Sequence, residues 1–150
     1  MRLSPNFSLA EAVKSQTALR LGIDNTPTAA VIDRMKAVCE AILEPVREHF
    51  QRPVVVNSFY RSPILNNKVG GAENSQHVKG EAVDFEIMGV PNAEVAEWVR
   101  DNLEYDMCAL EFYTSGQPNS GWVHVSYKET GCRGECITIG ANGTVAGLVS

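Results

Sequence analysis

The most informative stretches of this sequence are Ser75-Gln-His-Val-Lys-Gly-Glu-Ala-Val-Asp84 and Gly121-Trp-Val-His-Val-Ser126. Within them, His77, Asp84 and His124 offer two imidazole nitrogens and one carboxylate oxygen. This ligand set suits a catalytic zinc ion that keeps its fourth position for water. We therefore predict one zinc ion per chain, held by these three side chains.

The pattern around the ligands indicates how they are presented. Residues 82–87 alternate between the two faces of a strand, so Asp84 lies opposite Val83 and Phe85, and His124 lies opposite its apolar neighbours in the same way. Gly80 allows the chain to turn between His77 and Asp84. A carboxylate in an otherwise apolar strand is costly to bury without a cation or a donor.

Each of these residues also has an ordinary structural interpretation. A lone histidine in an apolar strand is often a hydrogen-bonded core residue, and an aspartate after a glycine is often part of a turn. The combination of the three residues favours the metal site over these alternatives.

Ser75-x-His77-x-x-Gly80-x-Ala82-x-Asp84, with Trp122-Val-His124, resembles the metal-binding signature of the zinc D-Ala-D-Ala carboxypeptidase family, the M15 peptidases. This family includes phage endolysins that cut peptidoglycan stem peptides. The similarity continues through 58–66 and 69–71, and loosely through 7–11, where it looks most like the phage-borne branch. The resemblance implies a zinc peptidase that hydrolyses a bond involving a D-amino acid in peptidoglycan, in the setting of host-wall lysis.

Glu111 is the candidate general base. In Ala109-Leu-Glu-Phe-Tyr113 it faces away from Leu110 and Phe112, toward the predicted ligand face. The family places a carboxylate with this role at the corresponding position before the Trp-x-His element. The competing carboxylates are Glu81, Glu86 and Glu104, of which Glu86 is the strongest because it shares a face with Asp84.

Three further residues are candidates for contact with the substrate. Arg61 follows a predicted strand, and its guanidinium suits an oxyanion or a substrate carboxylate, a role that family members give to an arginine here; capping of carbonyls at the strand end is the alternative. Ser75 is expected to hydrogen-bond the substrate. Trp122 is expected to line the cleft, although it also suits the core.

Composition restricts the possible functions. With 150 residues, 44% of them hydrophobic, residues 1–150 are expected to form a single domain. The net charge of -5 disfavours nucleic-acid binding and gives no reason to bind anionic membranes. The N-terminus has no apolar run of signal-peptide or membrane-span length, so we expect a protein that is cytoplasmic as synthesised and, if phage-encoded, released to the wall by another factor.

The pattern along the chain predicts an α+β fold, with helices on one face of a small antiparallel sheet and zinc on the other. The expected elements are a helix from Ser8 to Gly22, a long helix after Pro27 kinked near Pro45, a buried strand at 53–60, an ordered loop at 62–76, a helix at 93–103, a strand at 107–113, a loop at 115–121, a strand carrying His124, and a weakly patterned tail after Gly140. His49 is assigned to the end of the long helix, where a cation complements the helix dipole.

The four cysteines divide into two kinds. Cys39 and Cys108 have apolar neighbours and are expected to be buried. Cys132-Arg-Gly-Glu-Cys136 is compatible with a metal site or a small disulfide ring, and we favour reduced cysteines at a hairpin.

Two other functions remain open at this stage. One is a non-catalytic binding or virion-structural module that keeps the fold. The other is a D-Ala-D-Ala dipeptidase or carboxypeptidase that acts on soluble precursors. The sequence leaves open which bond is cleaved, the host and the oligomeric state.

Overall fold

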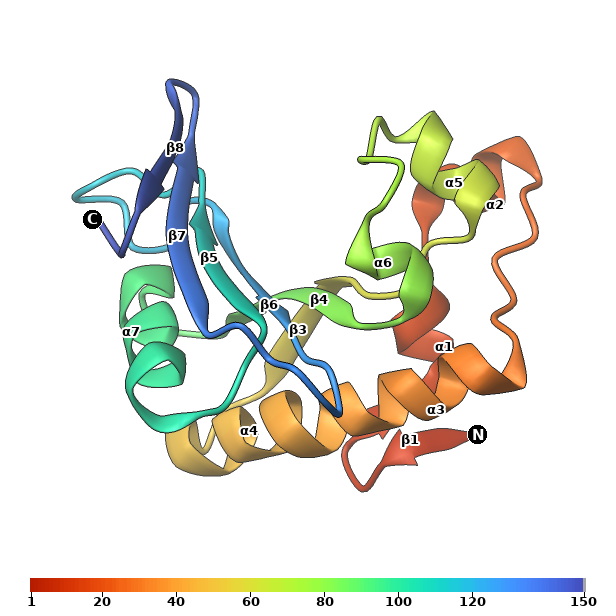
Figure 1. The fold of residues 1–150 in the computed structure, drawn as a ribbon, viewed down its shortest axis with the longest axis horizontal. Coiled ribbons are helices and arrows are strands. Elements are labelled where there is room, and N and C mark those ends of the chain that lie inside the picture. Colours follow the sequence, from red (N-terminus) through yellow and green to blue (C-terminus); the bar gives the residue numbers. More distant parts are fainter. Residues whose placement is uncertain (150) are drawn as a thin grey trace.

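The computed structural model describes residues 1–149 and has a mixed α+β fold, which confirms the predicted fold class (Figure 1). A two-stranded sheet pairs β1 with β2, and a six-stranded sheet has the order β3-β4-β6-β5-β7-β8. The strands are β1 Arg2–Ser4, β2 Phe7–Ser8, β3 Val54–Ser58, β4 Ala82–Ile87, β5 Met107–Glu111, β6 Trp122–Ser126, β7 Glu135–Gly140 and β8 Gly143–Ala146. The large sheet is antiparallel except where β5 and β7 run parallel.

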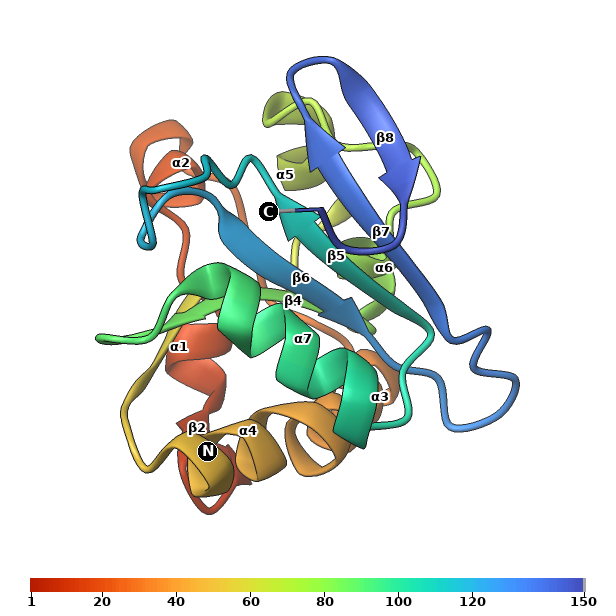
Figure 2. The same ribbon diagram turned by 90° about the vertical axis from the view of Figure 1, so that its left-hand side faces the viewer.

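The helices lie on both sides of this sheet. They are α1 Leu9–Val13, α2 Gln16–Leu21, α3 Ala29–Val38, a π-helical turn at Cys39–Leu43, α4 Glu44–Phe50, α5 Pro63–Lys68, α6 Gln76–Lys79 and α7 Asn92–Asn102. Figures 1 and 2 show α4 and α7 against one face of the central strands, with α5 and α6 on the other. Within residues 1–149, none of the helices has the length and apolar character needed to cross a membrane.

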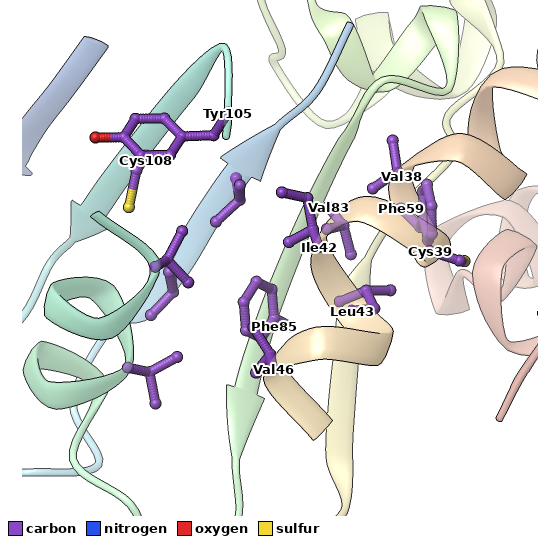
Figure 3. Packing of buried hydrophobic residues seen from close by; sticks show 14 of the residues in the cluster. Val38, Cys39, Ile42, Leu43, Val46, Phe59, Val83, Phe85, Tyr105 and Cys108 are labelled. Carbon is purple, nitrogen blue, oxygen red and sulfur yellow. The ribbon is translucent and has the colours of Figure 1, made fainter. Parts of the chain in front are cut away.

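The main hydrophobic core lies between the sheet and the long helical segment 29–50. The alternating side chains of β4 and β6 face this core, where Val83, Phe85 and Val123 are fully buried, and Ile42 and Val46 meet them from the helices (Figure 3). Full burial of such a side chain contributes about 1.5–3 kcal/mol relative to its exposure. The same alternation turns the intervening polar residues of these strands toward the opposite face, where the candidate site lies.

Pro45 is accommodated by a local change in the helix rather than by the expected kink. The segment widens into the π-helical turn directly before α4, and the backbone N–H of Glu44 donates to Cys39 O, five residues back. Proline lacks an N–H, and its ring crowds the preceding turn of an α-helix. The wider turn accommodates it while the helix continues.

Gly80 ends α6 in the left-handed conformation, with φ +75°, and its N–H donates to carbonyls of Gln76 and His77. This helix packs closely on α3: a Cβ at position 80 would lie 2.8 Å from Val31 Cγ1 and 2.9 Å from Met35 Cγ. Glycine is therefore needed here both for the turn and for the close approach of the two helices.

Two expectations about the helices were wrong. The stretch 62–76 is not simply a loop, because Ser62 caps α5 through its hydroxyl and Pro63 occupies the first turn of that helix. The predicted helix from Ser8 to Gly22 is two helices, because Ser15 caps α2 and interrupts the run; α2 does end at Gly22 in the left-handed conformation. Both missed starts carry an N-capping serine, and both helices are too short to show clear periodicity.

The strands also differ from expectation in three places. β3 is not buried but is a half-exposed edge strand, since β4 is its sole partner in the sheet. β5 ends at Glu111 rather than at 113, because Phe112 has φ +55°. The tail contains β8. Its side chains are all exposed, so no buried face produces an apolar pattern in its sequence.

The cysteines are all free in residues 1–149, with Cys39 and Cys108 buried as predicted. Cys132 and Cys136 do not flank a hairpin. Cys132 lies in the connection from β6 to β7, and Cys136 lies in β7 opposite Cys108 of the parallel strand β5.

Replacing Gly80 by alanine tests the close packing of α6 on α3. Gly70→Ala is the matched control, because Gly70 has φ +76° but no atom within 4 Å of a Cβ at its position. Left-handed strain alone should cost Gly70→Ala about 1–2 kcal/mol. Gly80→Ala should lose about 2 kcal/mol more through overpacking. Urea unfolding measures both, and equal losses would contradict the packing argument.

Candidate metal centre and active site

Three side chains from different elements converge on the sheet face opposite the main core. His77 comes from α6, Asp84 from β4 and His124 from β6, and one ligand atom from each lies within 4.8 Å of the others. Asp84 and His124 are directly paired across β4 and β6. His77 Nε2 lies 3.3 Å from Asp84 Oδ2, and His124 Nδ1 lies 2.8 Å from Asp84 Oδ1. The structure thus brings together the three residues predicted as metal ligands.

The hydrogen bond of His77 fixes which of its nitrogens faces the site. His77 Nδ1 lies 2.8 Å from Phe59 O in a buried environment. Because a carbonyl oxygen only accepts, Nδ1 carries a proton, and Nε2 is the nitrogen that faces Asp84. A backbone carbonyl that orients a histidine in this way is a common feature of metal sites.

The donor set fits a tetrahedral divalent ion. Ligands bonded at about 2.0–2.1 Å in a tetrahedron lie about 3.3 Å from one another. The His77 Nε2 to Asp84 Oδ2 distance of 3.3 Å matches this spacing. A cation bound between His77 Nε2 and Asp84 Oδ2 would take the place of the hydrogen bond that joins them.

The electrostatics of the three groups are coupled. Burial would raise the pKa of Asp84, but hydrogen bonds from His124 and His77 outweigh it and hold this pKa well below its usual value. Burial would lower the pKa of His124, but the hydrogen bond to Asp84 outweighs it and raises this pKa. Asp84 is therefore present as a carboxylate, the form that binds a metal ion.

Glu111 lies beside the triad at the end of β5, where it pairs with Trp122 of β6. Its Oε2 accepts a hydrogen bond of 3.1 Å from Trp122 Nε1 and lies 3.7 Å from His124 Nδ1. Burial raises the pKa of Glu111, with the charge of Asp84 adding to the effect, while His124 opposes it. Trp122, predicted as a cleft wall, thus also holds the candidate base in position.

The rival carboxylate Glu86 is engaged elsewhere. Its Oε2 accepts a hydrogen bond of 3.0 Å from Asn57, and its Oε1 accepts one of 3.2 Å from Asn92. These contacts give Glu86 a structural partner on each oxygen. His49 lies outside the site, with its ring stacked on Trp98 at 4.4 Å.

Arg61 lines a hollow of about 480 Å³ that also reaches Lys14 and Asp84. Its Nε is buried and has no hydrogen-bond partner within residues 1–149. Burial lowers the pKa of Arg61, while the charges of Asp84 and Glu111 oppose the shift. The Arg61 side chain therefore lines the space next to the triad and keeps one buried N–H without a protein partner among the described residues.

Ser75 has a clear structural role. Its hydroxyl accepts a hydrogen bond of 3.2 Å from His77 N and so caps α6. Its contact with a substrate stays a prediction.

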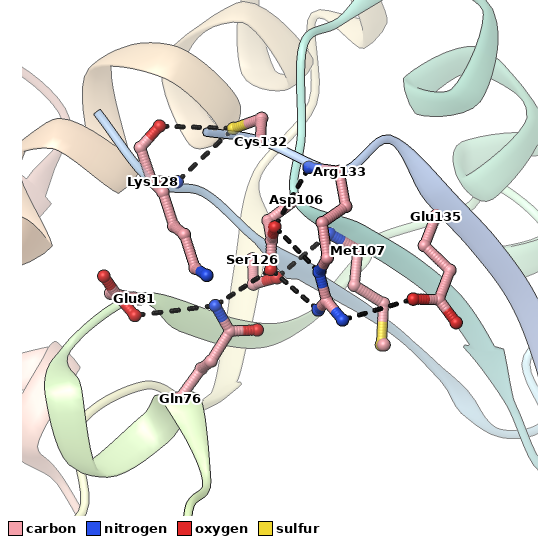
Figure 4. A network of polar contacts seen from close by, with 9 residues as sticks. All are labelled: Gln76, Glu81, Asp106, Met107, Ser126, Lys128, Cys132, Arg133 and Glu135. Carbon is pink, nitrogen blue, oxygen red and sulfur yellow. Dashed lines mark hydrogen bonds and ion pairs between the residues drawn. The ribbon is translucent and has the colours of Figure 1, made fainter. Parts of the chain in front are cut away.

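The sequence reasoning missed Asp106, which is fully buried at the start of β5. Figure 4 shows Arg133 and Gln76 converging on it: Arg133 Nη2 donates at 2.8 Å and Nε at 3.0 Å, and Gln76 Nε2 donates at 3.1 Å. Gln76 precedes the ligand His77 in α6, so its hydrogen bond to Asp106 anchors the helix that presents the histidine. An acidic residue directly before an apolar strand was the available signal, since its burial requires a partner.

These features define the class of the site: a partly buried triad of two histidines and a carboxylate, with a second carboxylate and a guanidinium beside it, in an α+β domain. The family model of Peptidase M15 matches residues 5–126. The chain therefore belongs to the Peptidase M15 family, which confirms the resemblance and identifies the chain as a member of a peptidase family. Comparison with curated proteins finds no significant match.

Removing any of His77, Asp84 or His124 should abolish tight metal binding. Loss of an outer hydrogen-bond partner typically weakens a metal site by about 10–100-fold, so loss of one of three ligands should exceed roughly 100-fold. Zinc serves as the probe, with its content and dissociation constant measured on the purified His77→Ala, Asp84→Ala and His124→Ala variants.

His49→Ala is the matched control, because it removes the remaining histidine from a position outside the site. Replacing Cys132 and Cys136 by serine should also leave the zinc content unchanged. Wild-type zinc affinity in the three triad variants would refute the ligand assignment, and loss of half the metal in the cysteine variant would reveal a second site.

The Asp106 ion pair should make stability depend on pH. The hydrogen bonds from Arg133 lower the pKa of Asp106 to about 2, against about 3.9 for a free aspartate. Its contribution should therefore be full above about pH 4 and lost as the pH falls through about 2. The difference in unfolding free energy between the parent and Asp106→Asn should shrink over this interval in urea titrations. A difference that does not vary with pH would contradict this ion pair.

Proposed function

We propose that this protein is a zinc-dependent peptidase that hydrolyses a bond involving a D-amino acid in peptidoglycan stem peptides, as a phage-type wall-lytic enzyme. In this proposal the protein is made in the host cytoplasm and reaches the wall through another factor. The observation that carries the catalytic part is the convergence of His77, Asp84 and His124 with Glu111 on one sheet face. The resemblance to phage lysins supports the biological setting.

Zinc is the metal we propose for the triad, because two neutral imidazoles and one carboxylate are a frequent ligand set of catalytic zinc. When bound, it would lower the pKa of water and polarise the scissile carbonyl. Asp84 and the orientation of His77 supply the charge and the lone pair that this ion requires.

Glu111 is proposed as the proton carrier. Its Oε2 is held by Trp122 and lies 3.7 Å from His124 Nδ1, so the carboxylate stands beside the triad, where it can take a proton from the attacking water and pass it to the leaving amine. Burial raises the pKa of Glu111, which makes its carboxylate a stronger base than that of an exposed glutamate.

Arg61 is proposed to hold the oxygen on which negative charge develops, or a carboxylate of the substrate. Its buried Nε has no other partner, and its side chain lines the hollow beside Asp84. A preorganised cation in a site of this kind stabilises a developing oxyanion without reorganisation.

Mass spectrometry of peptidoglycan and of soluble stem peptides after incubation with the protein tests the proposal and identifies the bond. Cleavage that stops on chelation and returns with zinc is expected. Cleavage of soluble peptides alone would favour the dipeptidase or carboxypeptidase alternative. A zinc-loaded protein that cleaves neither would favour the non-catalytic module.

Glu111→Gln should separate catalysis from metal binding. The amide keeps the size of the side chain and can still accept from Trp122, but it cannot take the proton of water. Zinc content and unfolding should stay close to those of the parent, while the initial rate on the cleaved peptide falls roughly 10²-fold or more.

Glu86→Gln is the matched control, because Glu86 lies on the same face as Asp84 in β4, which β6 separates from β5. Its rate should change much less. If Glu86→Gln abolishes cleavage and Glu111→Gln retains it, the wrong carboxylate has been assigned.

A further inference from the structure

Phe112 directly follows Glu111 and is a large apolar residue that lies exposed near the site. Its side chain is 47% exposed, and its backbone has φ +55°, in the left-handed region that a bulky residue rarely adopts. Continuation of the strand would have turned this ring toward the core. The left-handed turn instead places the ring beside Trp122, with 5.4 Å between the ring centroids.

The surrounding contacts hold Phe112 in this conformation. Phe112 N donates to Ile139 O of β7 at 2.7 Å. At Gly121 the returning chain passes so closely that a side chain there would collide with the backbone of Glu111 and Phe112. Trp122 is in turn fixed by its hydrogen bond to Glu111. The two rings therefore form a preorganised aromatic surface next to the candidate base.

The loop that continues from this surface has no charged residue. Residues 112–122 read Phe-Tyr-Thr-Ser-Gly-Gln-Pro-Asn-Ser-Gly-Trp. The loop is tied down by Asn92, whose N–H donates to Pro118 O at 3.0 Å and whose amide donates to Ser120 O at 2.9 Å. The side chains of Gln117 and Asn119 in this loop are exposed, so their amides are accessible to a ligand.

The opposite side of the site has a different character. The hollow that contains Lys14 and Arg61 lies at β3, whereas Phe112 follows β5, and the ligand strands β4 and β6 separate the two in the sheet. One wall thus carries cations suited to the carboxylates of a peptide, and the other carries aromatic rings and uncharged hydrogen-bonding groups. Aromatic rings pack against the apolar faces of a ligand, while hydroxyls and amides bind its polar edges.

We propose that Phe112 and Trp122, with the loop 113–121, form a binding surface for the sugar rings of a glycan strand. The pyranose rings of a glycan have apolar C–H faces and a rim of hydroxyls and amides, which matches this uncharged wall. The inference rests on the proposed function and makes it more specific: the substrate is the peptide while it is attached to its glycan, rather than a free precursor.

Binding of peptide-free glycan strands tests this surface without any cleavage. The strands are prepared by removing the stem peptides from peptidoglycan, and their binding to the zinc-loaded protein is measured by calorimetry. Phe112→Gly should reduce the affinity at least tenfold. This variant removes the ring and also relieves the left-handed strain, so it should be at least as stable as the parent in urea.

Two further variants serve as matched controls. Phe112→Trp keeps an aromatic ring and should retain binding. Met88→Ala removes a side chain that is 59% exposed just beyond β4, outside this surface, and should have no effect. Glycan strands that bind the parent and Phe112→Gly equally, or that bind neither, would overturn the proposal.

Kinetics supply an independent criterion. Phe112→Gly should raise KM at least tenfold on polymeric peptidoglycan and change kcat/KM on soluble stem peptides less than threefold. An equal loss on both substrates would place the ring against the peptide and overturn the glycan assignment. A parent that cleaves neither substrate would refute the proposed function. The binding of peptide-free glycan strands would still test whether this surface binds sugar rings.

Discussion

Asp84 places a negative charge on a central strand of the sheet, and the site is built around that charge. A carboxylate removed from water is costly unless it is paired, and here hydrogen bonds from both His77 and His124 outweigh the desolvation. The strand needs a valine and a phenylalanine on its other face to hold the core together. The alternation of β4 therefore serves both stability and chemistry. Side chains on one face of the strand pack in the core, and Asp84 on the other face is a candidate metal ligand.

His77 depends on contacts far from it in sequence. Its helix has four residues, too few to be stable alone. Gly80 packs the helix onto α3, Phe59 O orients the imidazole, and Asp106 accepts the hydrogen bond that anchors Gln76, the residue before it. The position of this one ligand atom thus follows from the packing of several elements rather than from local propensity.

The residues that line the site were easier to predict from sequence than the residues that hold them in place. Alternation was sufficient to place Asp84, His124 and Glu111 on one face, because the period of a strand is local information. The partners of these residues were not visible in the same way: Asp106 and Arg133 are 27 residues apart and meet because β7 joins the sheet parallel to β5. β8 is exposed along its length, and α5 is only six residues long, so neither had a hydrophobic pattern to reveal it.

The segment beyond residue 126 lies outside the match to the family, yet it supports both sides of the site. Arg133 neutralises the buried Asp106 behind the helix of His77, and Ile139 O receives the N–H that keeps Phe112 turned outward. β7 is paired with β5 along its length, so both contacts lie next to the strand that carries Glu111. The metal ligands come from the family-matched part of the chain, whereas the shape of the wall beside the candidate base depends on the strand that follows it.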